Sequence, residues 1–170
     1  MFSAVLRPVR YFVEALANGD APQRIGLGVA LGMLVGLVPK GNLTAVVLGV
    51  LALSLQANLA AVLGSAGLFT LLSVWVDPLA HDVGLRVLSR PGLQSIGAWL
   101  YDLPLVPWTA LNNTVVFGSL LLGAVLFWPV YYMVWRGCQR GRPWLAARLA
   151  KYRVREALLL VEAAPYGRKR

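Results

Sequence analysis

Two polar clusters interrupt the apolar runs of this chain, and the first of them centres on Lys40. Lys40 and Asn42 lie in Pro39-Lys40-Gly41-Asn42, between apolar runs at 25–38 and 43–55. An ammonium group there can bind an anion, and the amides of Asn42 and of Asn58, further along, can orient it. A lysine inside a bilayer costs several kcal/mol unless it finds a partner or water, so its presence suggests an anionic partner. The alternative is an ordinary interfacial turn in which Lys40 extends to the headgroups.

The second cluster contains Asp77 and His81, which would share one face if this segment is helical. A proton relay or two metal ligands are conceivable there, but two ligands are too few for zinc. His81 also lacks a nucleophile at motif spacing. The alternative is a helix cap with hydrogen-bonded polar side chains. With one Cys and one His in the chain, no multi-histidine or four-cysteine metal site can form. The sequence shows no catalytic constellation, so we expect no catalytic residues, no cofactor and no enzyme.

The composition indicates the class of protein that must position these groups. The chain has 170 residues, of which 58% are hydrophobic and only 14% charged, whereas soluble domains carry about 25% charged residues. We therefore expect an all-α integral membrane protein rather than a water-soluble enzyme.

The lengths of the apolar runs predict how each one meets the bilayer. The runs at 25–38 and 43–55 would give helices of about 20 Å, shorter than a hydrocarbon core of about 30 Å. They favour a re-entrant or short helical hairpin over two tilted spans. Residues 59–76, ending at Asp77-Pro78, and residues 115–135 can each cross fully. Short interfacial helices are expected at 83–88 and 93–103.

Both ends of the chain carry expected helices outside these spans. Apolar residues at helical spacing over 2–16 predict an amphipathic helix in the membrane interface. Residues 144–163 predict a basic helix. We therefore divide the chain into a membrane domain at 1–135 and a basic cytoplasmic tail at 136–170.

The distribution of charge predicts the orientation in the membrane. Ten of the 16 basic residues lie in the last 35 positions, and the segment 77–113 is nearly balanced. Basic flanks stay on the cytoplasmic side, so we expect a multi-pass membrane protein with both termini cytoplasmic. The basic tail is expected to bind anionic lipid headgroups rather than nucleic acid.

Gly28, Gly32 and Gly36 recur at four-residue spacing. Small residues on one helix face let a second helix approach closely in lipid. The stripe therefore predicts either packing inside one subunit or self-association of two chains.

Several of these motifs together resemble a known group of proteins. The pattern consists of a small-residue helix that begins Ile25-Gly-Leu-Gly and ends Gly36-Leu-Val-Pro39-Lys-Gly-Asn42, followed by Gln56-Ala-Asn58 and then by Asp77-Pro78 before Gly84. It is similar to bacterial membrane proteins of the domain-of-unknown-function 2062 type. Asp77 stands where Asn is commoner in that pattern. Asn112-Asn113-Thr114 resembles the start of the last span in a small subgroup from bacteria with outer membranes. The resemblance implies an inner-membrane protein without an established activity, associated with a larger envelope protein.

Two functions are consistent with these features. The first is a small membrane subunit or scaffold that assists a larger envelope protein, in lipid or envelope homeostasis. The second is a transporter or flippase for an anionic or lipid-linked substrate, in which Lys40 binds the anion. Self-association through the glycines would fit either one.

Overall fold

The computed structural model describes residues 21–163, with side chains as far as residue 141. Within this part all regular secondary structure is helical, as the composition predicted. The helices are α2 (Pro22–Leu37), α3 (Leu43–Ser54), α4 (Leu59–Leu88), α5 (Pro91–Tyr101), the short 3₁₀ helix η1 (Pro107–Thr109) and α6 (Thr114–Ala163). The amphipathic helix predicted at 2–16 lies outside the described residues.

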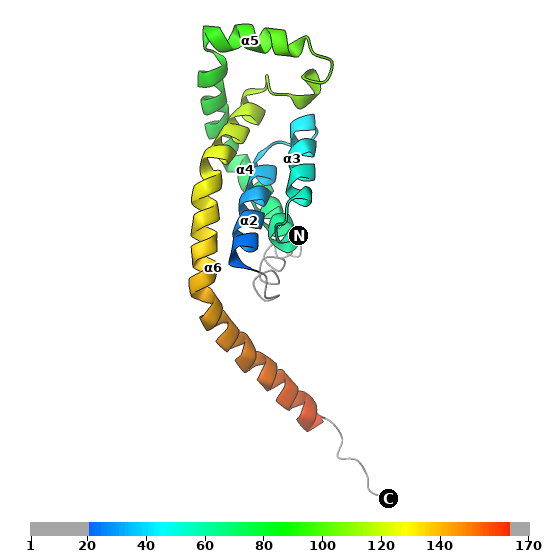
Figure 1. The fold of residues 1–170 in the computed structure, drawn as a ribbon, viewed down its shortest axis with the longest axis vertical. Helices are drawn as coiled ribbons and strands as arrows, with labels where there is room; N and C mark the ends of the chain where they lie inside the picture. The colour runs from blue at the N-terminus through cyan, green and yellow to red at the C-terminus, as the bar shows by residue number, and fades with distance from the viewer. Residues whose placement is uncertain (1–20, 164–170) are drawn as a thin grey trace, which may run out of the picture.

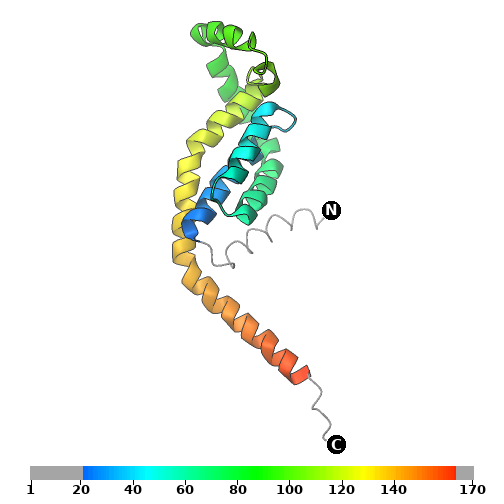
Figure 2. The ribbon, with the colours of Figure 1, turned by 45° about the vertical axis from the view of Figure 1, so that its right-hand side comes forward.

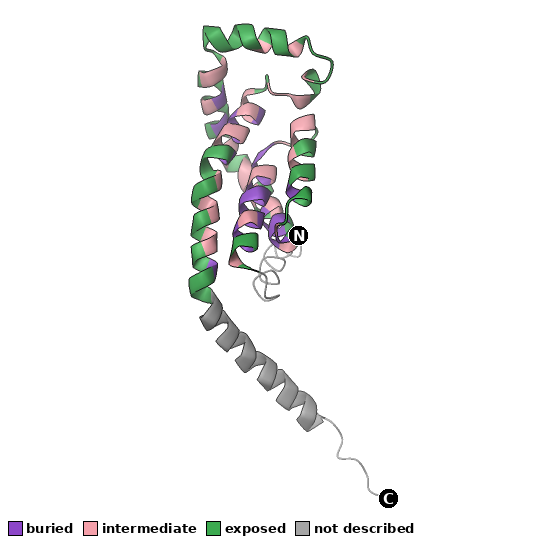
Figure 3. Cartoon of the chain, in the orientation of Figure 1, coloured by how far each residue is buried: buried purple, intermediate pink, exposed green. Residues whose placement is uncertain are grey.

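Helix α2 forms the centre of the bundle. It packs against both α4 and α6, which also pack on each other; Figure 3 shows most of its length buried. The helix is apolar on all sides after Arg24, and an evenly hydrophobic helix is stable when neighbours surround it. Its fully buried side chains include Ile25, Ala30 and Met33.

Helices α2 and α3 form an antiparallel hairpin whose two ends lie together. The backbone N–H of Asn58, just after α3, donates to the carbonyl of Arg24 in the first turn of α2 at 3.0 Å. With 16 and 12 residues, the helices are about 24 and 18 Å long at 1.5 Å per residue. Both are shorter than a bilayer core. Figure 1 shows α3 on the outside of the bundle.

Helix α4 does not end at Asp77-Pro78, where the sequence suggested a break. It continues through Pro78 to Leu88, so the short helix expected at 83–88 is its last part. An internal proline removes one backbone hydrogen bond and clashes with the preceding turn. Packing between helices can offset that loss, and Ala80 and Gly84, just after Pro78, are buried. The next helix, α5, begins at Pro91 rather than at residue 93.

Helix α6 runs without interruption from Thr114 to Ala163. The separate basic helix expected at 144–163 is therefore the continuation of the last apolar helix, with no backbone break at the proposed boundary between 135 and 136. Figures 1 and 2 show α6 extending far beyond the bundle. Two helical stretches among the described residues are long and apolar enough to cross a membrane, Leu59–Leu88 and Thr114–Gly141.

Candidate functional site

The turn between α2 and α3 is built by Gly41 and Asn42. Gly41 has a φ of +92°, in the left-handed region that glycine adopts without strain. Asn42 is the N-cap of α3: its Oδ1 accepts from the backbone N–H of Ala45 at 2.8 Å, while its Nδ2 donates to the carbonyl of Pro39 at 2.8 Å. Both ends of this amide therefore hold the turn together.

Lys40 turns back over the end of α2. Its Nζ donates to the carbonyls of Val35, Gly36 and Val38, the last at 2.7 Å. The final carbonyls of a helix have no partner within the helix and attract cations. Partial burial lowers the pKa of the Lys40 amine, because it removes water from the charged form. The ammonium group predicted to bind an anion thus caps its own helix.

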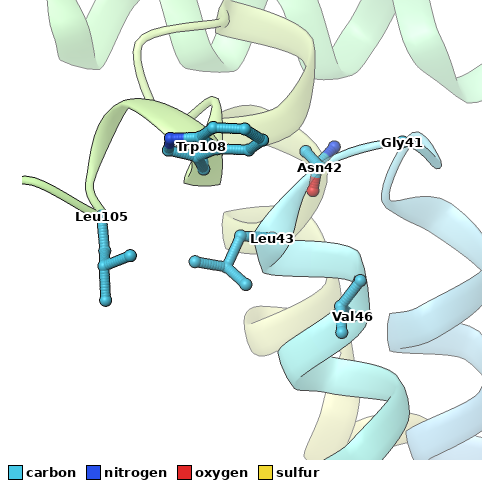
Figure 4. A pocket seen from close by; sticks show the side chains of 6 residues that line it. All are labelled: Gly41, Asn42, Leu43, Val46, Leu105 and Trp108. Carbon is cyan, nitrogen blue, oxygen red and sulfur yellow. The ribbon is translucent and has the colours of Figure 1, made fainter.

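A pocket of about 350 Å³ lies beside this turn. Figure 4 shows the side chains of Leu43 and Val46 from α3 below the ring of Trp108, with Leu105 on the opposite side. Asn42 and Gly41 complete the lining, which does not include Lys40. The hydroxyl of Thr44 donates to the carbonyl of Thr109 at 2.8 Å and fixes α3 to η1. The pocket is therefore mostly apolar, with one amide at its edge.

Asn58 lies at the other end of the hairpin and does not share a site with Lys40 or Asn42. It is the N-cap of α4, with Oδ1 accepting from the backbone N–H of Ala61 at 2.7 Å. It is 7% exposed and lies beside Gly28 of α2. The three polar residues grouped by the sequence thus divide between the two ends of α2.

Asp77 and His81 lie one turn apart on α4, and neither caps a helix, because α4 continues past both. Asp77 Oδ1 is buried and has no hydrogen-bond partner among the side chains and backbone of residues 21–141. His81 Nδ1 lies 2.6 Å from the hydroxyl of Thr114, the first residue of α6. Among the described residues, no three His, Cys, Asp or Glu side chains are grouped closely enough to hold a metal ion.

The glycine stripe of α2 lies against α4 of the same chain. A Cβ built on Gly28 would fall 2.7 Å from the carbonyl oxygen of Asn58, and one on Gly36 would fall 2.6 Å from the Cβ of Phe69. A Cβ on Gly32 would collide with Ser65 and Val62. The space that these glycines leave is thus filled within one subunit.

Two further glycines, Gly84 and Gly118, create a second close approach that sequence reasoning missed. A Cβ on Gly84 would collide with the backbone of Thr114, and one on Gly118 would collide with the backbone of Ala80. The two lie on different helices, so no spacing within one helix reveals them. They bring α4 and α6 into backbone contact next to His81.

Comparison with known proteins gives the family of this chain. A family model described as "Uncharacterized protein conserved in bacteria (DUF2062)" matches residues 6–143. A relative from Treponema pallidum (strain Nichols) is 27% identical over 127 residues, covering 75% of this chain and 78% of the relative, and is itself an "Uncharacterized protein". No solved structure matches. The resemblance inferred from the motifs is confirmed, and the chain belongs to the bacterial DUF2062 family.

Proposed function

We propose that this protein is a small inner-membrane subunit or scaffold that assists a larger envelope protein, in lipid or envelope homeostasis. The observation that carries the proposal is that the polar side chains form hydrogen bonds at helix ends of the same chain. Lys40 bonds to the end of α2, Asn42 to the start of α3 and Asn58 to the start of α4. These groups stabilise helix ends, whereas a transport site would need them to face a ligand.

The proposed topology follows from the charge and from the order of the helices. Both termini lie in the cytoplasm, α4 and α6 cross the inner membrane, and α5 and η1 lie on the opposite side. The pair α2 and α3 forms a short helical hairpin that enters from the cytoplasmic side, and each of its helices is shorter than the hydrocarbon core. Its turn lies beside η1, where Trp108 is 73% exposed and suits the interface between lipid and water.

The outer face of α3 is the surface proposed for the larger partner. Val46, Val50 and Leu53 repeat at helical spacing and are each about 60% exposed. A helix of 12 residues cannot span the bilayer, so apolar helices of a partner can cover this face. The basic continuation of the chain after residue 136 would bind anionic headgroups, and no role in binding nucleic acid is proposed.

Affinity purification in mild detergent from native membranes tests this proposal. The tagged chain should recover a larger protein at constant stoichiometry. Val50→Trp should reduce the recovery, because the larger side chain would clash with the partner at this face. Val125→Trp is the matched control, since Val125 is 71% exposed on α6, outside that face. Recovery of the chain alone, or equal recovery by both variants, would contradict the proposal.

A transporter for a lipid-linked or anionic substrate is the second candidate, and the pocket beside the hairpin turn favours it. In that case Lys40→Ala should abolish transport while the protein remains folded. If the protein is a subunit, the same variant should recover the partner as well as the natural chain does. The single substitution therefore separates the two candidates.

A further inference from the structure

A second pocket, of about 420 Å³, lies beneath α5 at the end of the bundle where α4 ends and α6 begins. Its volume is within the range of small-molecule sites, about 300–1,000 Å³. Apolar side chains from four segments form most of its wall: Leu88 of α4, Leu93 of α5, Val106 and Leu111 of the following loop, and Phe117 of α6. Such a lining suits a hydrocarbon chain.

Polar groups at this pocket hold its wall in place. The hydroxyl of Tyr101 donates to Asn112 Oδ1 at 2.6 Å and accepts from the backbone N–H of Asn112 at 2.7 Å. This pair ties the end of α5 to the loop that leads into α6. The pocket is therefore formed by a fixed bridge rather than by loose packing of α5.

Gly97 leaves part of the pocket open. It lines the pocket from the middle of α5, and a Cβ built on it would meet nothing within 4 Å. Gly92, on the same helix, is equally open but does not line the pocket. A large side chain at position 97 would therefore alter the wall of the pocket, whereas one at position 92 would not.

Two arginines give this end of the molecule a positive charge. Arg86 in the last turn of α4 and Arg90 at the N-cap of α5 are exposed, and they flank Leu88 in the sequence. Neither forms an ion pair among the side chains of residues 21–141. The nearest acidic residues in the sequence are Asp82 and Asp102. Neither arginine lines the pocket, but Arg90 lies in the sequence between Leu88 and Leu93, which do. A guanidinium near an apolar pocket complements a phosphate group.

We infer that this pocket binds one acyl chain of an anionic phospholipid, with the phosphate near Arg90. The apolar wall would contact the acyl chain, and the two arginines would attract the negatively charged headgroup. The pocket also adjoins the ends of the two helices that can cross a membrane, where phospholipid is abundant. This inference does not rest on the partner proposed above.

Titration of the purified full chain with dioleoyl phosphatidylglycerol, followed by native mass spectrometry, tests the inference. The natural chain and Gly92→Leu should each retain one lipid, whereas Gly97→Leu should bind at least tenfold more weakly. Both variants replace a glycine of α5 by leucine, a change that favours the helix in each case. Arg90→Gln should reduce binding of phosphatidylglycerol but leave weak binding of dioleoyl phosphatidylcholine unchanged.

A photoreactive phosphatidylglycerol with a diazirine on its acyl chain gives a second measurement, on the natural chain. Cross-links should map to α5 and residues 106–117. This measurement does not depend on whether Gly97→Leu folds. Three results would overturn the inference: equal lipid binding by Gly97→Leu and Gly92→Leu, cross-links on α3 instead, or equal affinity for both headgroups. Loss of a dimer in Gly97→Leu, without loss of lipid, would instead assign the pocket to a second copy.

Discussion

Gly118 of α6 and Ala80 of α4 lie in direct backbone contact, since any Cβ on Gly118 would collide with the Ala80 carbonyl. One turn further along α4, Gly84 meets the backbone of Thr114 in the same way, and His81 reaches the hydroxyl of Thr114. The two helices that can cross a membrane are thus held at their shared end by small residues and one polar contact. Small residues at such contacts let apolar helices associate in lipid.

Replacing Gly118 by alanine should therefore destabilise the bundle. The added methyl group meets backbone, which cannot rotate away, and overpacking of this kind costs about 1–3 kcal/mol. Gly137→Ala on the same helix is the matched control, because a Cβ there meets nothing within 4 Å. Thermal unfolding in detergent should show a lower midpoint for Gly118→Ala and an unchanged or higher midpoint for Gly137→Ala. Equal midpoints would contradict the backbone contact.

The glycine stripe of α2 allows a test between packing in one subunit and self-association. Gly32 faces Ser65 and Val62 of the same chain, so Gly32→Ala should lower the unfolding temperature without changing the oligomeric state. Gly49→Ala on α3 serves as the control, since Gly49 has open space around it. Size-exclusion chromatography with light scattering measures the oligomeric state. A shift from dimer to monomer in Gly32→Ala would support self-association instead.

Asn58 should contribute to stability through its position at the start of α4. Loss of its side-chain bond to the backbone of Ala61 leaves a buried N–H without that acceptor, and loss of such a cap costs about 1 kcal/mol. Asn58→Ala should therefore unfold at a lower temperature, while Asn58→Ser, which keeps an acceptor oxygen, should recover most of the loss. If Asn58→Ser unfolds at the same temperature as Asn58→Ala, the cap is not how Asn58 stabilises the protein.

The sequence predicts well those features that depend on neighbouring residues. Short apolar runs around Pro39-Lys40-Gly41-Asn42 predict the hairpin of α2 and α3, and Asn112-Asn113-Thr114 marks the start of the last span. The structure places Asn113 Oδ1 within 2.9 Å of the backbone N–H of Val115. Caps and turns of this kind are local, because their partners lie two or three residues away.

Features that depend on distant residues were missed. Asp77-Pro78 looks like a helix end in the sequence, yet α4 continues, with Ala80 in backbone contact with Gly118, 38 positions later. The candidate site shows the same limit. Lys40 and Asn42 share a turn because they are adjacent, while Asn58 lies at the other end of α2. Trp108 and Leu105 line the pocket, but their apolar side chains carry no chemical signature that marks a site.

The contact between the hairpin turn and η1 predicts which residues share one side of the membrane. Thr44 bonds to Thr109, so cysteines at positions 40 and 108 should react with a membrane-impermeant maleimide added to the same side. In the proposed topology a cysteine at Gly141, which is exposed on α6, reacts only from the cytoplasmic side. Each variant is made with Cys138 replaced by alanine and is measured in intact cells and in inverted vesicles. Opposite reactivity of positions 40 and 108 would contradict the packing of α3 on η1, whereas matching reactivity of positions 108 and 141 would contradict the topology.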